Sequence, residues 1–66
     1  MTAQLTKKWD GFSLAIAHDD RTGDRRHEFN IRGEGKTKHD AVTAALSAIK
    51  EARADLDRAE AEINTF

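Results

Sequence analysis

Apolar and polar side chains alternate along residues 12–18, and the alternation returns along residues 26–32. A period of two residues is typical of a strand that buries one face. A shorter run at residues 4–9 leads into the dipeptide Asp10-Gly11, which suits a two-residue turn between antiparallel strands. The pattern predicts three strands, at about 4–9, 12–18 and 26–32, joined as an antiparallel β-meander.

The turns also predict which residues face one another across the sheet. A turn at Asp10-Gly11 gives the first hairpin the pairs Trp9–Phe12, Lys7–Leu14 and Leu5–Ile16. In the second hairpin, apolar matching and charge matching agree on the pairs Ile16–Phe29, Asp20–Arg25 and Asp19–Arg26. In this register Trp9 covers one edge of the core, and His27 is an edge histidine on the inward face.

The chain after Gly35 is predicted to form one long helix. This segment contains no glycine or proline and has eight alanines, and Thr37 is suited to cap the first turn. We expect the helix over about residues 38–64, which completes a single α+β domain of residues 1–66 with the order βββα. Its larger apolar residues recur every seven positions, at Val42, Ile49, Leu56 and Ile63.

The predicted helix is longer than the predicted sheet. The helix is roughly 40 Å long at 1.5 Å per residue, whereas a strand over residues 12–18 covers about 23 Å. The sheet should therefore cover only the first half of the helix and leave Leu56 and Ile63 exposed. We expect a second chain to cover them, and the simplest arrangement is a homodimer with a seam formed by Ala52, Leu56, Ala59 and Ile63.

The composition lacks the usual supports of a small domain. The 66 residues include no cysteine, and the three histidines, His18, His27 and His39, have no clustered carboxylate in a metal-ligand spacing. No serine, histidine and acid form a recognisable catalytic arrangement. We therefore expect a non-enzymatic protein without a cofactor or a metal ion.

The longest apolar run, residues 12–17, is too short for a membrane span, and the N-terminus lacks the apolar core of a signal peptide, so we expect a cytoplasmic location.

The charges are unevenly distributed although the net charge is only −1. Residues 21–39 hold six Lys or Arg against three acids, whereas residues 51–62 hold five acids against two arginines. One interpretation of the acidic half is a solvated helix surface with the ion pairs Arg53–Asp57 and Arg58–Glu62. The other is a surface that presents carboxylates to a basic groove on a partner, with the candidate binding residues Glu51, Asp55, Asp57, Glu60 and Glu62.

The run from Gly33 to Ala45, which begins Gly-Glu-Gly-Lys-Thr-Lys-His-Asp-Ala, resembles the junction between the third strand and the helix of double-stranded RNA-binding domains. The resemblance implies phosphate contacts from basic residues at the helix start, and the matching positions are Lys36, Lys38 and His39. It covers about a fifth of the chain. Val42 stands where the family has its last phosphate-binding lysine, and the family's first helix has no counterpart.

In its small size, its lack of cysteine and catalytic residues, and its compact sheet with a charged helix, the whole chain is similar in architecture to the anti-CRISPR proteins encoded by phages and mobile elements. This resemblance implies a protein partner in a bacterial cytoplasm, namely an RNA-guided surveillance complex whose basic DNA-binding surface meets the acidic helix. We therefore expect a binding protein of this inhibitor type. The alternative is a reduced nucleic-acid-binding module that uses Lys36, Lys38 and His39.

Overall fold

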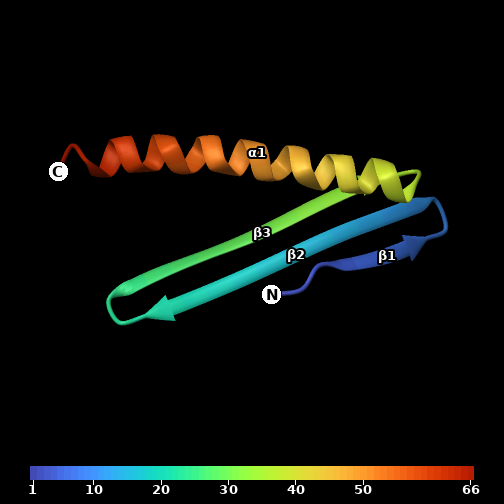
Figure 1. The fold of residues 1–66 in the computed structure, drawn as a ribbon, viewed down its shortest axis with the longest axis horizontal. Helices are drawn as coiled ribbons and strands as arrows, with labels where there is room; N and C mark the ends of the chain where they lie inside the picture. Colours follow the sequence, from blue (N-terminus) through green and yellow to red (C-terminus); the bar gives the residue numbers. More distant parts are fainter.

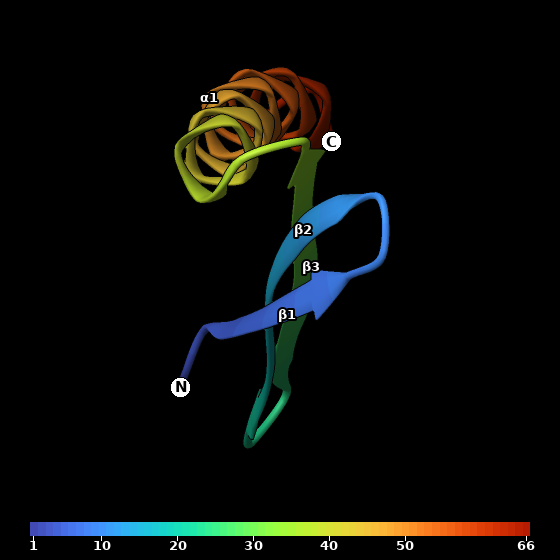
Figure 2. The same ribbon diagram turned by 90° about the vertical axis from the view of Figure 1, so that its right-hand side faces the viewer.

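A computed structural model of residues 1–66 contains three strands followed by one helix: β1 (Gln4–Lys8), β2 (Gly11–Thr22), β3 (Arg25–Gly35) and α1 (Lys38–Ile63). The strands form one antiparallel sheet in the order β1-β2-β3, so the predicted βββα fold is confirmed (Figure 1). The helix lies on one side of the sheet, mainly over β3, and β1 forms the edge that is remote from it (Figure 2).

The first hairpin differs from the predicted register by two residues. Leu5 pairs with Leu14 and Lys7 with Phe12, because the turn lies at Trp9-Asp10 rather than one residue later. Gly11 is the first residue of β2, with a φ of 152° that favours glycine. A Cβ at Gly11 would lie 3.2 Å from the carbonyl carbon of Gly35, so the residue is fixed by its packing against the neighbouring strand.

The second hairpin is also two residues out of the predicted register. Its turn is Gly23-Asp24, with a φ of 60° at Gly23 and a negative φ at Asp24, as in the type II′ turn. The central pairs are Ile16–Ile31, His18–Phe29 and Asp20–His27. The turn lengthens both strands to residues 11–22 and 25–35, beyond the predicted 12–18 and 26–32.

The observed register places like charges opposite each other on the outer face of this hairpin. Asp19 faces Glu28 and Arg21 faces Arg26, so the predicted pairs Asp19–Arg26 and Asp20–Arg25 are wrong. Ion pairs run along each strand instead, with Arg21 3.5 Å from Asp19 and Arg26 3.9 Å from Glu28. These groups are exposed, and such pairs contribute little. Charge matching was therefore too weak to override the geometry of the glycine turn.

The helix begins as predicted. Thr37 has an extended conformation, and its hydroxyl accepts a hydrogen bond from the Asp40 amide at 3.1 Å. The first turns then pack directly on β3, where Ala41 is completely buried and Gly33 and Ala45 are buried beside it. A Cβ at Gly33 would lie 2.8 Å from the Cα of Ala45. The core of the domain is therefore a contact between backbone and small side chains at one end of α1.

The helix and the β2–β3 hairpin diverge from this contact (Figure 1). The larger residues Ile31 and Phe29 lie on the same face of β3 as Gly33, farther from the start of α1. They meet Ile49 and Leu56 across a groove. As the sequence predicts, Leu56 and Ile63 are exposed, at 68% and 67%. The predicted cause is wrong, because the strands are long enough to follow the helix but point away from it. The result is an elongated molecule with Cα extents of 48 × 23 × 13 Å.

Substitution of Gly33 by alanine should unfold the domain or destabilise it strongly, because the added methyl overlaps the backbone of α1. We expect the free energy of unfolding to fall by about 1–3 kcal/mol or more. Urea denaturation with circular dichroism as the signal measures this loss. Asn30→Thr is the matched control, since Asn30 is exposed on the outer face of the same strand and threonine is favourable in strands. Equal losses in both variants would contradict the packing described for Gly33.

Candidate functional site

An apolar groove separates the middle of α1 from the inward face of the β2–β3 hairpin. It has a volume of 260 Å³, and its lining is apolar except for Arg53: Met1, Ile16, Phe29, Ile31, Ile49, Ala52, Arg53 and Leu56. Only Ile31 among these large side chains is buried in the single chain. A second, smaller groove of 170 Å³ continues beside it past Val42 and Leu46. The inward side of this domain is therefore only partly covered by its own residues.

The predicted dimer seam extends the apolar groove along the second half of α1. We call it the apolar strip; it consists of Ala52, Leu56, Ala59 and Ile63. Only Ala52 is half-buried, and the other three are exposed. The spacing of these residues keeps them on one side of the helix at about 100° per residue. The strip is a single continuous surface, as its heptad spacing indicates.

The five predicted acidic residues border the apolar strip on both flanks. At about 100° per residue, the first flank carries Glu51, Asp55 and Glu62, and the second carries Asp57 and Glu60. All five are exposed. We call them together the acidic surface. It is divided by the apolar strip, so a partner that contacts both flanks must also contact Leu56 and Ile63.

Most carboxylates of the acidic surface have no ion-pair partner within the chain. Neither of the predicted ion pairs Arg53–Asp57 and Arg58–Glu62 forms, and Arg58 pairs instead with Asp55 one turn earlier in the helix. The last turn of α1 contains no basic residue. Glu60 and Glu62 therefore lie near the negative end of the helix dipole, where a carboxylate is unfavourable.

The predicted nucleic-acid-binding residues lie at the opposite end of the molecule. Lys36, Lys38 and His39 are exposed around the start of α1. The turn between β1 and β2 reaches the same end (Figure 1), and a shallow pocket there joins Lys8 and Asp10 to Gly35 and Lys36. Lys8 is held 3.2 Å from Glu34 by an ion pair. We call Lys7, Lys8, Lys36 and Lys38 the lysine end.

Trp9 belongs to the lysine end rather than to the core. Its side chain is 97% exposed, so the expectation that it covers the core edge is wrong. The shift in register is the cause, since it moves Trp9 out of β1 and into the turn. An exposed indole beside lysines can stack on a base or on another planar group.

One cluster at the far end of the hairpin shows that the expectation of no carboxylate clustered with the histidines is wrong. His18, Asp20 and His27 bring one ligand atom each to within 4.8 Å of one another. They share the inward face of the hairpin: Asp20 is opposite His27 in the observed register and His18 is diagonal to it, whereas the predicted register would place His18 opposite His27 and Asp20 diagonal. The signal that could have found the cluster is the shared face, because His18 and Asp20 are two residues apart on one strand and His27 lies on the inward face of the next.

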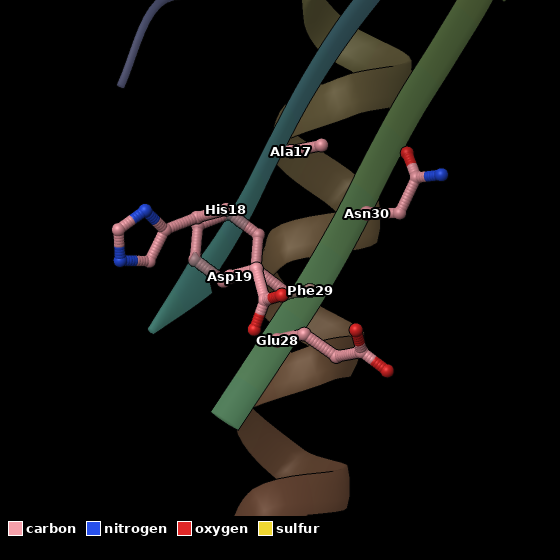
Figure 3. Close-up of a pocket in the computed structure, with 6 residues that line it drawn as sticks. All are labelled: Ala17, His18, Asp19, Glu28, Phe29 and Asn30. Carbon is pink, nitrogen blue, oxygen red and sulfur yellow. The ribbon is translucent and has the colours of Figure 1, made fainter. Parts of the chain in front are cut away.

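The outer face of the same hairpin is shown in Figure 3, with α1 behind the strands. Asp19 and Glu28 lie on the near side, and the rings of His18 and Phe29 lie next to each other, with centroids 5.6 Å apart. A hollow of 610 Å³ runs along these residues and Asn30. It has charged walls and no buried polar group, so it is a shallow surface feature rather than a ligand cavity.

Comparison of the chain with protein-family models, with curated protein sequences and with solved structures finds no match. The helix does not contain a stretch that is both long enough and apolar enough to cross a membrane. The surfaces described above are therefore the basis for assigning a function.

Replacement of Trp9 by alanine should leave the domain stable, because an exposed side chain contributes little to folding. We expect a change of less than about 0.5 kcal/mol in the free energy of unfolding, measured by urea denaturation with circular dichroism as the signal. Ile31→Ala is the comparison, since Ile31 is 8% exposed and such a truncation costs about 2–5 kcal/mol. A similar loss of unfolding free energy in both variants would show that Trp9 contributes to the core and would contradict its exposed position.

Proposed function

We propose that the protein is a small non-enzymatic inhibitor of phage or mobile-element origin that binds a bacterial nucleoprotein complex in the host cytoplasm. The binding residues are those of the acidic surface together with the apolar strip. The observation that carries the proposal is the position of exposed Leu56 and Ile63 between two flanks of carboxylates. A partner with apolar side chains among basic ones would match this pattern.

The apolar part of the proposal rests on incomplete burial. Full burial of a leucine or isoleucine side chain contributes roughly 1.5–3 kcal/mol, and Leu56 and Ile63 gain little of it within one chain. The apolar groove adds Phe29 and Ile49 to the same side of the molecule. Binding of a partner there would therefore stabilise the domain as well as hold the partner.

The electrostatic part rests on carboxylates without cationic neighbours. Four of the five acids have no ion-pair partner, and Glu60 and Glu62 also oppose the helix dipole. A cationic partner removes both penalties. Surfaces that bind DNA or RNA carry arginines and lysines for phosphate contacts, so a helix with carboxylates on both flanks can compete for such a surface.

A second copy of the chain is a poorer match for this surface. Two apolar strips in contact bring the acidic flanks of both helices together, and like charges in contact are unfavourable. The homodimer through Ala52, Leu56, Ala59 and Ile63 remains the alternative occupant. Sedimentation of the wild type and of Leu56→Asp distinguishes the two occupants. The variant sediments at a lower mass than the wild type only if the wild type self-associates through the apolar strip.

The inhibitor proposal predicts that the protein blocks target-DNA binding by a purified RNA-guided surveillance complex from bacteria. Charge reversal at Asp57→Lys with Glu60→Lys should raise the half-inhibitory concentration at least 10-fold, since about 1.4 kcal/mol corresponds to tenfold. Inhibition should also weaken with added salt. A mobility-shift assay of the complex with its target duplex measures both effects.

The matched control is Lys36→Glu with Lys38→Glu, which changes charge at the other end of the molecule and should leave inhibition unchanged. Circular dichroism of each variant separates lost binding from lost folding. The proposal is excluded if the wild-type protein inhibits no representative of the known surveillance types. It is also excluded if Asp57→Lys with Glu60→Lys inhibits as strongly as the wild type.

A second candidate function is nucleic-acid binding at the lysine end, and the exposure of Trp9 beside these lysines favours it. This function predicts a salt-sensitive shift of duplex RNA or DNA by the protein alone. Trp9→Ala and Lys36→Glu with Lys38→Glu should each weaken the shift, whereas Asp57→Lys with Glu60→Lys should strengthen it. Mobility shifts at two salt concentrations test this function, and the absence of any shift at low salt would remove the candidate.

A further inference from the structure

Two histidines and one aspartate converge on the inward face of the β2–β3 hairpin, near its closed end. His18 and Asp20 are two residues apart on β2, so their side chains leave the strand on the same face. His27 on β3 is the direct partner of Asp20 and shares that face. We propose that His18, Asp20 and His27 form a binding site for a divalent transition-metal ion, with zinc as the ion to test.

The distances between the groups suit a site that closes around an ion. The three ligand atoms lie within 4.8 Å of one another, and His18 Nε2 is 4.0 Å from a carboxylate oxygen of Asp20. The imidazole centroids of His18 and His27 are 5.7 Å apart. Tetrahedral ligands at about 2.1 Å from zinc are about 3.4 Å apart. Rotation about one χ angle can move a ligand atom by about one to two ångströms, which is enough to bring the three atoms to the separations that zinc requires.

The backbone around the cluster limits how far the ligands can move apart. The pairs His18–Phe29 and Asp20–His27 are neighbours within a continuous antiparallel ladder, and the tight turn at Gly23-Asp24 closes that ladder. A ligand set on paired strands therefore has little backbone entropy to lose when an ion binds. Sites built on strands are held more precisely than sites on loops.

Asp20 also has the supporting contact that metal-binding carboxylates commonly have. The hydroxyl of Thr22 donates a hydrogen bond to Asp20 Oδ1 at 2.8 Å. This contact orients one oxygen and leaves the other, Oδ2, on the side of His18. Such second contacts orient the ligands, and their loss costs metal proteins 10–100-fold in affinity. The ring of Phe29 lies beside that of His18, with the two centroids 5.6 Å apart.

The donor set selects the class of ion. Two imidazoles and one carboxylate suit zinc, cobalt, nickel or copper, whereas calcium and magnesium prefer oxygen ligands alone. Three protein ligands leave at least one coordination position for water or an added ligand. Arg25 lines the same 190 Å³ hollow as Asp20, Thr22 and His27. Its guanidinium favours an anion at the open position, so the bound ion would link the hairpin to an anionic group.

Zinc binding by the wild-type protein, without a purification tag, should be measurable by isothermal titration calorimetry with one ion per chain. The cobalt complex should give a visible absorption band from its nitrogen and oxygen ligands. We expect His27→Gln and Asp20→Asn each to lower zinc affinity at least 10-fold, and Thr22→Val to lower it by about 10-fold. These residues are exposed or half-buried, so the variants should fold.

His39→Gln is the matched control, because it removes a histidine from the far end of the molecule and should leave zinc affinity unchanged. The proposal is overturned if the wild type binds zinc no more tightly than His27→Gln, or if His39→Gln loses as much affinity as His27→Gln. Added zinc should also raise the thermal midpoint of the wild type and leave that of His27→Gln unchanged. The same assays do not involve the acidic surface, so they are independent of the proposed inhibitor function.

Discussion

The arrangement of this protein depends on the contact between β3 and α1 at Gly33. The two backbones approach so closely there that a single added methyl would overlap the helix, and Ala41 and Ala45 are the small residues that allow the approach. Larger side chains follow on both elements, with Ile31 and Phe29 on the strand facing Ile49 and Leu56 on the helix. Small residues at one end and large residues at the other set the two elements at an angle (Figure 1). The apolar groove is the direct consequence.

This splayed arrangement explains why the domain has separate surfaces of different chemistry. The lysine end lies where the elements meet, and the acidic surface lies on the half of α1 that the hairpin does not follow. A chain of 66 residues has little core to stabilise it in any case, and here no large side chain is fully buried. Exposed Leu56 and Ile63 are therefore a cost in the isolated chain that binding of a partner can offset.

Much of the fold could be predicted from the sequence, because strong local signals specify it. The alternation in β2, the cap at Thr37 and the alanine-rich segment give the βββα order and the start of α1 correctly. The register does not follow from the apolar pattern, since a shift of two residues keeps every side chain on the same face and satisfies the same pattern. Close packing at Gly11, which is a tertiary contact, and the two-residue turn at Gly23 decide the register. The apparent charge match between Asp20 and Arg25 favoured a different register.

The candidate sites differ in how directly the sequence places their residues. The acidic surface belongs to one helix, so its spacing is fixed by the helical period alone and was available from the sequence. The metal-site residues His18, Asp20 and His27 come from two strands, and a register two residues different would place His18 opposite His27 and Asp20 diagonal to it, so the shared inward face gathers the three in either register. The metal-site residues lie on the open side of the molecule, since they share the inward face of the hairpin with Phe29 of the apolar groove. A partner in the groove would therefore lie next to His18, which is opposite Phe29 on the same face.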